Sequence, residues 1–159
     1  MKALLLALAA LLAGPALAMT GVVTRVSDGD TVWVRPDDAT KRKPVKVRLV
    51  GIDAPERCQP WGAEATAALS ARVLHRRVEV PTRGVDTHGR VLGGLRLDDG
   101  SDVAAWMVSQ GHAWSSRYQR YPGPYAREQR EARQRRAGLF ADAEAVEPWR
   151  FRKAHGPCD

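Results

Sequence analysis

The order of β-rich and helical segments predicts an α+β domain, a five-stranded closed barrel of the OB type with three flanking helices. Five runs have the composition of strands, one helical segment follows the third run, and two more follow the fifth. An Asp-Gly pair joins the first two runs and is typical of a tight hairpin. The predicted strands are Gly21 to Val26, Thr31 to Arg35, Val45 to Val50, Arg77 to Thr82 and Val91 to Leu97.

Helical spacing and capping residues define the three predicted helices. In the first, Ala65, Leu69 and Val73 recur four positions apart, as on a helix face packed against a core. Ser101 is the predicted N-cap of the second helix, and Gly111 ends it. The predicted helices are Trp61 to Arg77, Asp102 to Gln110, and Tyr125 to Ala137.

The first eighteen residues have the pattern of a secretory signal peptide. Lys2 precedes the apolar run Ala3 to Leu12, and Ala16-Leu17-Ala18 is typical of a cleavage site. The apolar run is short for a membrane span. We therefore expect residues 1–18 to be removed, and the protein to be exported to a periplasm or to the outside of the cell. No stable membrane association is expected after cleavage. Residues 19–141 should form one domain, followed by a tail at 142–159, and the protein is expected to be a monomer.

The chain is basic, with a formal net charge of +7. Such a charge favours an anionic partner, and nucleic acid, anionic lipid and acidic polysaccharide all satisfy it. Charge alone therefore limits the partner and leaves the reaction open.

Two cysteines are present, Cys58 and Cys158. In an exported protein an even number of cysteines favours a disulfide, which would tie the tail to the centre of the sequence. Two separate thiols are the alternative.

The stretch from Arg48 to Glu56 combines a strand end with an acidic turn. Pro55 keeps Ala54 out of the helical region, so Asp53 and Glu56 lie on a constrained turn. Two carboxylates and a guanidinium this close together suit a cation, a water to be activated and a phosphate. A solvated turn at a strand end is the alternative interpretation.

Three other segments carry candidate residues, each with a structural alternative. The turn after Asp28 needs no second acid, so Asp30 is a candidate functional carboxylate, or else a solvated turn residue. His88 and Arg90 follow a predicted hairpin turn and could be ordinary surface residues there. Tyr118 and Tyr121 lie in a tyrosine-rich loop that could stack bases or pack on the domain.

Taken together, four motifs resemble those of the staphylococcal nuclease family, in that family's order and at near its spacings. The motifs are Asp28-Gly29-Asp30-Thr31, Arg48-Leu49-Val50-Gly51-Ile52-Asp53-Ala54-Pro55-Glu56, Asp86-Thr87-His88-Gly89-Arg90 and Gln110-Gly111-His112-Ala113-Trp114. The resemblance extends from about Gly21 to Phe140. It implies the OB barrel with flanking helices and an exported calcium-dependent phosphodiesterase that acts on DNA and RNA and leaves 3′-phosphate ends.

The resemblance also implies individual roles. Asp30, Asp53 and the backbone carbonyl of Ala54 would be ligands of Ca²⁺. Glu56 would be the general base, and Arg48 and Arg90 would bind the phosphate. His88 stands where the family's founding member has a tyrosine, and Tyr118 or Tyr121 would replace a tyrosine pair that does not align without a gap.

Two other functions are compatible with parts of the sequence. One is an OB-fold nucleic-acid binding module without catalysis. Such a module would be expected to lack one or more of the five candidate residues Asp30, Arg48, Asp53, Glu56 and Arg90. All five are present. The other is a basic protein that attaches to anionic surfaces, which would bind many polyanions and form no product.

Overall fold

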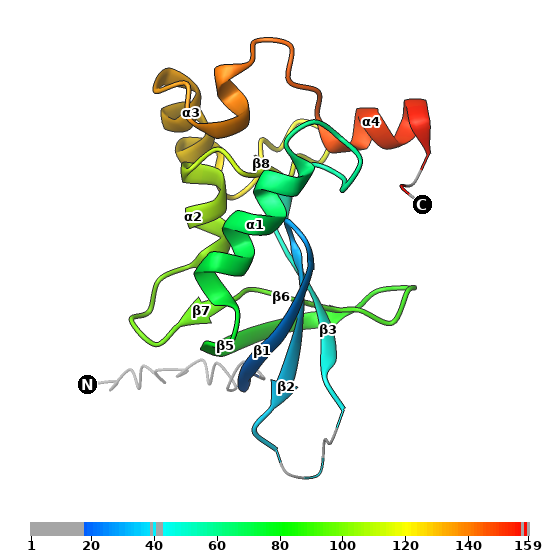
Figure 1. Cartoon of the computed structure of the whole chain (residues 1–159), viewed down its shortest axis with the longest axis vertical. Coiled ribbons are helices and arrows are strands. Elements are labelled where there is room, and N and C mark those ends of the chain that lie inside the picture. The colour runs from blue at the N-terminus through cyan, green and yellow to red at the C-terminus, as the bar shows by residue number, and fades with distance from the viewer. Residues whose placement is uncertain (1–17, 39, 41–42, 157, 159) are drawn as a thin grey trace, which may run out of the picture.

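The computed structural model describes residues 18–38, 40, 43–156 and 158. Its strands build a barrel in the lower part of the molecule, and the helices gather over one end and one side of it (Figure 1). The predicted signal peptide lies outside the described residues except for Ala18, which begins the first strand.

Five strands close the barrel as the sequence predicts. The order along the sheet is β1, β2, β3, β6, β5, and β5 pairs with β1 to complete the circle. All neighbours are antiparallel except β3 and β6. These strands are β1 (Ala18–Asp28), β2 (Thr31–Pro36), β3 (Val45–Leu49), β5 (Arg77–Val85) and β6 (Val91–Gly93).

Three short strands extend this framework. β7 (Arg96–Leu97) pairs with β5, while β4 (Ile52–Asp53) and β8 (Trp114–Ser115) form a separate two-stranded sheet. The predicted strand Val91 to Leu97 is therefore divided into β6 and β7. A side chain at Gly93 would have its Cβ only 2.9 Å from the Pro81 carbonyl oxygen, so the chain approaches β5 closely and then leaves it.

The described residues form four α-helices, where the sequence predicts three. They are α1 (Gly62–Val73), α2 (Val103–Ser109), α3 (Ala126–Gln134) and α4 (Pro148–His155), and a 3₁₀-helix spans Gly138–Ala141. The predicted Ser101 cap is wrong, because the side chain of Asp102 accepts the hydrogen bond from the Ala105 amide. The extra helix, α4, lies in the predicted tail.

The core fills the barrel and the space under α1 and α2. Apolar side chains from alternate positions of β2 and β3 point inward, and one face of α1 covers them. Fully buried examples are Val32, Val34, Val47, Leu49, Leu69 and Val73. Within the described ranges, no helix has the length and apolar character needed to cross a bilayer.

Candidate active site

The β1–β2 turn delivers the first acidic residues. The strand ladder ends at the pair Asp28 and Thr31, and Asp28 Oδ1 accepts a hydrogen bond of 3.1 Å from the Asp30 amide. A Cβ on Gly29 would lie 2.7 Å from the Cβ of Ala54 and 2.9 Å from that of Ala65. Only glycine therefore lets this turn press against the second acidic turn and against α1.

Asp30 is buried, with 6% of its surface exposed, and both carboxylate oxygens have partners. Oδ1 accepts from the Thr31 hydroxyl at 3.0 Å, and Oδ2 accepts from the Ala54 amide at 2.9 Å. The latter bond joins two turns that lie 24 residues apart in sequence. Asp30 is thus part of the framework of the site, and the alternative of a solvated turn residue is wrong.

Arg48, on β3, connects the two predicted calcium ligands. Its Nη2 lies 3.1 Å from Asp30 Oδ2 and 3.2 Å from Asp53 Oδ1. Its Nη1 donates to the carbonyl oxygens of Leu49 and Ile52, at 2.7 and 3.0 Å. The side chain is only 19% exposed, so it folds back over the end of its strand. These bonds fix the guanidinium beside both carboxylates.

The turn that carries Glu56 is closed by its neighbours. The backbone amide of Glu56 donates to the side-chain oxygen Oε1 of Gln59, and the backbone amide of Gln59 donates to the backbone carbonyl of Glu56. A Cβ on Gly62 would lie 2.0 Å from that same carbonyl oxygen. The beginning of α1 is therefore in direct contact with the turn and limits the positions open to Glu56.

Arg90 comes from the hairpin between β5 and β6. Its Nε donates to Asp86 Oδ2 at 2.7 Å, and its backbone amide donates to Asp86 Oδ1 at 2.9 Å. The amide of His88 donates to the same Asp86 oxygen, while the imidazole is 76% exposed. Asp86 thus orients Arg90 through one edge of the guanidinium.

A single cavity of about 460 Å³ brings these segments together. It contains every predicted catalytic and calcium-binding residue, together with His88, and adds Asp28 and Arg152. Its lining is Asp28, Asp30, Arg48, Asp53, Ala54, Pro55, Glu56, His88, Arg90 and Arg152.

The two candidate tyrosines lie elsewhere. The side chains of Tyr118 and Tyr121 are exposed. Neither belongs to the described residues that line this cavity. Their backbones pair with each other across a short turn. The third tyrosine of the loop, Tyr125, packs on the domain and donates its hydroxyl to Asp102 Oδ2 at 3.0 Å. Within the described part of the chain, these tyrosines therefore do not provide a base-stacking surface at the cavity.

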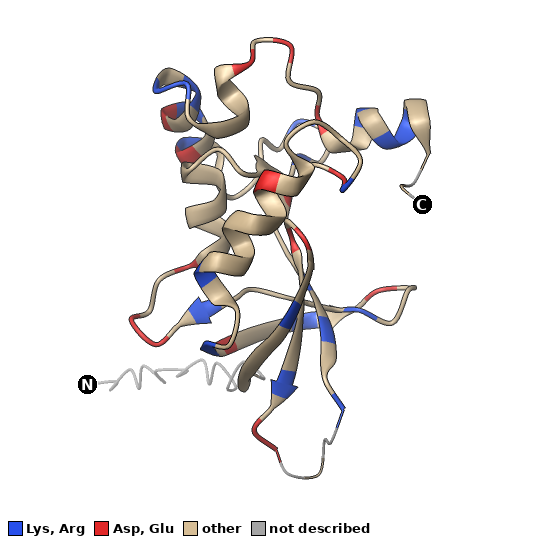
Figure 2. Ribbon diagram, viewed as in Figure 1, with Lys and Arg blue, Asp and Glu red and all other residues tan. Residues whose placement is uncertain are grey.

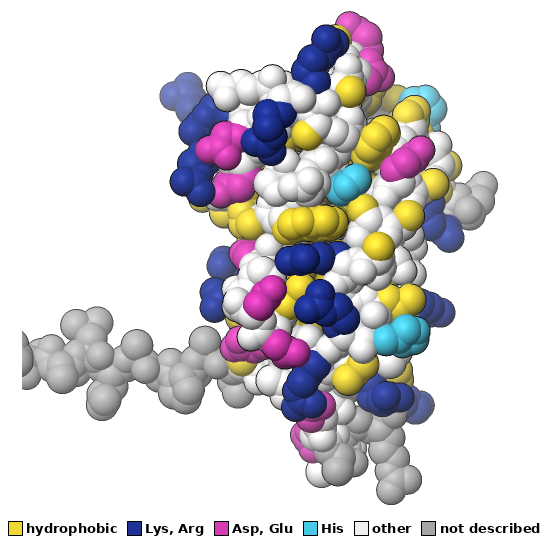
Figure 3. Space-filling model, turned by 60° about the vertical axis from the view of Figure 1, so that its left-hand side comes forward, with side chains coloured by type: hydrophobic (Ala, Val, Ile, Leu, Met, Phe, Trp, Pro, Cys, Tyr) yellow, Lys and Arg dark blue, Asp and Glu magenta, His cyan; other side chains and the backbone are white. Residues whose placement is uncertain are grey.

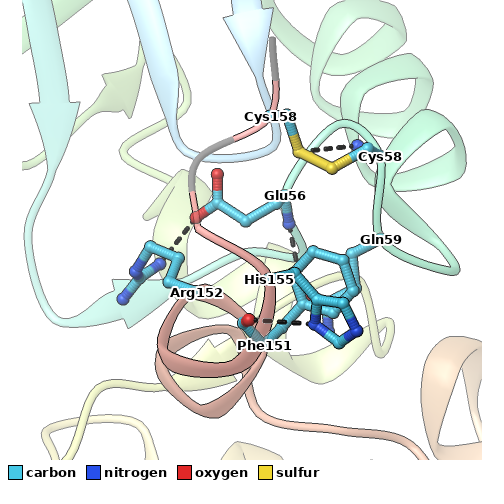
Figure 4. Close-up of a disulfide and its surroundings, with 7 residues drawn as sticks. All are labelled: Glu56, Cys58, Gln59, Phe151, Arg152, His155 and Cys158. Carbon is cyan, nitrogen blue, oxygen red and sulfur yellow. Dashed lines mark hydrogen bonds and ion pairs between the residues drawn. A yellow bond between two sulfur atoms is a disulfide. The ribbon is translucent and has the colours of Figure 1, made fainter.

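Arg152 is the site residue that sequence reasoning missed. It lies on α4, and its Nη1 donates to Glu56 Oε1 at 2.7 Å and to Asp53 Oδ1 at 3.2 Å. Its Nη2 donates to Asp53 Oδ2 at 3.1 Å. Figure 4 shows Arg152 and Glu56 facing each other between α4 and the acidic turn.

A disulfide between Cys58 and Cys158 holds the end of α4 beside that turn (Figure 4). The predicted pairing therefore contained a signal that the basic tail lies beside the acidic turn. The bond brings the segment before Cys158 to the turn that contains Glu56, but it does not distinguish Arg152 from Arg150 or Lys153.

Burial and charge alter the acidity of the carboxyl groups. Burial, reinforced by the neighbouring Asp30 carboxylate, raises the pKa of Asp28 to about 6. Burial also raises the pKa of Asp53, and the hydrogen bonds and charge of Arg152 oppose this rise. The pKa of Arg152 is depressed by burial but raised overall by its bonds to Asp53 and Glu56, so it stays cationic.

The charge distribution on the surface is mixed. Figure 2 shows basic positions on α3 and α4 as well as on the strands, and acidic positions where the barrel strands reach the helices. On the face in Figure 3, basic, acidic and hydrophobic side chains alternate.

The donor set suits a hard cation. Asp30 and Asp53 both contact the same Arg48 nitrogen, so their oxygens face one small volume, and Ca²⁺ prefers carboxylate, carbonyl and water oxygens. Across the described ranges, no three His, Cys, Asp or Glu side chains form a complete metal site by themselves. A cation here would thus need backbone oxygen and water as further ligands, and Arg152 would have to give up its bonds to Asp53.

Comparisons with known proteins agree with the fold and the cavity. Residues 46–142 match the family model described as staphylococcal nuclease homologue. The chain is 42% identical over 152 residues to Protein ParB of Escherichia coli, covering 89% of this chain and 84% of that protein. It is 37% identical to a micrococcal nuclease of Shigella flexneri, covering 84% of this chain and 80% of that one.

A third relative, an uncharacterized endonuclease of Escherichia coli, is 40% identical over 134 residues, covering 83% of this chain and 84% of that protein. The matches thus extend over most of both sequences. The chain therefore belongs to the staphylococcal nuclease family, and with it to the nucleases.

Proposed function

We propose that the protein is an exported, calcium-dependent nuclease that hydrolyses phosphodiester bonds of DNA and RNA. The observation that carries this proposal is that one cavity brings together the three carboxylates and the two arginines to which the sequence assigns roles. The carboxylates are those of Asp30, Asp53 and Glu56, and the arginines are Arg48 and Arg90. The names of the relatives, a micrococcal nuclease and an endonuclease, support the same reaction.

The two arginines would bind the phosphodiester. A guanidinium presents several donors in one plane and is well matched to phosphate oxygens. Arg48 and Arg90 come from different parts of the barrel, so they can hold the phosphate from two directions. Negative charge on the equatorial oxygens increases as the nucleophile attacks, and positioned donors stabilise it.

Glu56 would be the general base. Its carboxylate lies in the same cavity as both arginines, on a turn fixed by Gln59 and Gly62. It would accept a proton from a water molecule that attacks phosphorus opposite the 5′-oxygen. The bond between phosphorus and the 5′-oxygen breaks, the 5′-oxygen takes up a proton from solvent and leaves as a hydroxyl group, and the phosphate remains on the 3′ end.

Asp30, Asp53 and the Ala54 carbonyl would hold the calcium ion, which when bound supplies positive charge to the phosphate and lowers the pKa of bound water. The export of the protein is part of the proposal because residues 1–18 have the signal-peptide pattern.

The decisive experiment compares cutting and binding. The chain from Met19 onward is incubated with single-stranded DNA and, separately, with RNA, in calcium or in chelator. We expect cutting only with calcium, and a fall in turnover of about 10²- to 10⁴-fold in Glu56→Gln, with binding preserved. End analysis should find 3′-phosphate groups.

Glu64→Gln is the matched control, because Glu64 is an exposed residue in the first turn of α1 and loses the same charge. Its turnover should equal that of the parent. Salt-sensitive binding with no cutting by the parent protein would instead assign it to the non-catalytic OB-fold modules. Cutting that persists in Glu56→Gln would disprove the role of the base.

A further inference from the structure

Arg152 is the most exposed of the three arginines in the cavity. Its side chain is 41% exposed, against 19% for Arg48 and 28% for Arg90. Arg48 is bonded to two backbone carbonyls, and Arg90 is bonded to a carboxylate outside the cavity lining. The three hydrogen bonds of the Arg152 guanidinium all end on the carboxylates of Asp53 and Glu56. Arg152 is therefore the arginine whose partners belong entirely to the site.

Both partners have another role in the proposed reaction, and this inference rests on that proposed function. Asp53 would bind the cation, and Glu56 would accept a proton from water. A cation at Asp53 repels the guanidinium and competes for the same two oxygens. Arg152 then needs a new anionic partner, and the substrate phosphodiester has to enter this cavity to reach Arg48 and Arg90.

The attachment of α4 keeps Arg152 at the cavity during such an exchange. The Glu147 carboxylate accepts from Arg117 at 3.0 Å and from the Trp149 indole at 2.7 Å. Gln59 donates to the Val146 carbonyl at 2.7 Å, and the Cys58–Cys158 disulfide fixes the far end of the helix. None of these contacts uses Arg152, so the helix stays in place when the guanidinium changes partner.

Arg152 also lies between two adjacent hollows. The second has a volume of about 230 Å³ and shares Arg48, Asp53 and Arg152 with the first. The rest of its lining is Trp114, Ser115, Ser116, Arg117, Glu147, Pro148 and Trp149, and the Glu147 carboxylate is paired with Arg117. A strand that passes from one hollow to the other therefore crosses Arg152.

We propose that Arg152 is a third phosphate-binding arginine of this site, which pairs with Asp53 and Glu56 in the resting protein and transfers its hydrogen bonds to a substrate phosphodiester when those carboxylates are engaged. The barrel provides two arginines permanently, and α4 adds one that exchanges partners.

The test measures binding of a single strand that cannot be cut. In the probe, a methylene group replaces each 5′-oxygen, so every linkage keeps its negative charge while the bond to phosphorus resists hydrolysis. With calcium present, Arg152→Ala should weaken binding about 10-fold or more. The slope of log affinity against log salt should also decrease by about 0.7 to 1, as expected for one lost phosphate contact. In chelator the effect should be several-fold smaller.

Calcium binding without nucleic acid provides a second readout. By calorimetry, Arg152→Ala should bind calcium more tightly than the parent, because a competing cation has been removed. Arg150→Ala is the matched control, since it removes the same charge from α4 but at a residue paired with Glu147 and stacked on Trp149. Arg150→Ala should change neither the affinity for the uncut probe nor the affinity for calcium by more than about 2-fold.

Arg152→Lys separates phosphate binding from a structural role. Its ammonium group should recover part of the affinity for the probe if a charge contact to phosphate is involved. An Arg152→Ala protein that binds the probe in calcium as tightly as the parent, or more tightly, overturns the inference. Calcium-dependent cutting by the parent would still stand in that case, so the two proposals fail separately.

Discussion

The cavity is built by two regions that are held in place in different ways. The barrel end contributes Asp30 and Arg48, which are largely buried and bonded to the backbone of neighbouring turns. The C-terminal region contributes Arg152 from α4, a helix of 8 residues in which only Pro148 is buried. Polar contacts and one disulfide hold that helix in place. The difference shows that one active site can combine a permanent framework with an attached segment.

The two regions should respond differently to the loss of a large side chain. Leu69→Ala removes a fully buried residue of α1 from the core and should lower the free energy of unfolding by about 2–5 kcal/mol. Phe151→Ala, on α4, removes a partly buried ring stacked on His155 at 4.4 Å, and should cost less than half as much. Urea denaturation followed by circular dichroism measures both.

Equal losses in the two variants would break the comparison, because they would place α4 in the same cooperative unit as the barrel. The slope of the unfolding free energy against urea concentration should remain unchanged in both proteins if each unfolds in one step.

The disulfide should matter most for the attached region. Reduction, or the double change Cys58→Ser with Cys158→Ser, should lower the free energy needed to open α4 by about 2–4 kcal/mol. Amide hydrogen exchange should show faster exchange in residues 148–155, with little change in β1 to β3. The physical reason is that the barrel strands are held by their own ladder and core.

Faster exchange throughout the barrel after reduction would contradict this prediction, since it would mean that the cross-link stabilises the whole fold. Alkylated, reduced parent protein serves as the control for the serine substitutions.

A smaller effect is expected within the barrel region itself, at the hairpin of Arg90. Desolvation would raise the pKa of Asp86, but hydrogen bonds from the backbone and side chain of Arg90 and from the His88 backbone lower it to about 2. Because this pKa is lower than the ordinary 3.8, the bonds stabilise the hairpin above pH 4, and that contribution is lost as the pH falls toward 2.

Nuclear magnetic resonance can follow this loss through the amide shifts of His88 and Arg90. In Asp86→Asn the same shifts should be nearly independent of pH between 4 and 2. A transition centred near 3.8 or above in the parent would show that Asp86 does not hold Arg90 through a carboxylate.

Sequence reasoning was most successful where neighbours along the chain determine the structure. The β-rich run Val45 to Val50 and the Asp-Gly turn at Gly29 predicted strands of the barrel, and the fold class is confirmed. The break between β6 and β7 was missed because it depends on how closely Gly93 approaches Pro81. Local patterns do not encode such an approach.

The attached region was harder to predict for a related reason. Arg152 meets Glu56 and Asp53 across 96 and 99 residues, and nothing in the composition of residues 142–159 marks that arginine among several others. The tyrosines illustrate the opposite problem. Tyr118 and Tyr121 have aromatic side chains of the kind that stacks on bases, yet these exposed side chains are not part of the cavity lining.

The disulfide also decides where added polypeptide would leave the molecule. Cys158 is bonded to Cys58, two positions from Glu56, so a purification tag fused behind it would begin beside the carboxylates. A run of histidines there would bring its own metal-chelating imidazoles next to the site under study. Calcium titrations and kinetic assays should therefore use protein whose C-terminal tag has been removed or was never added.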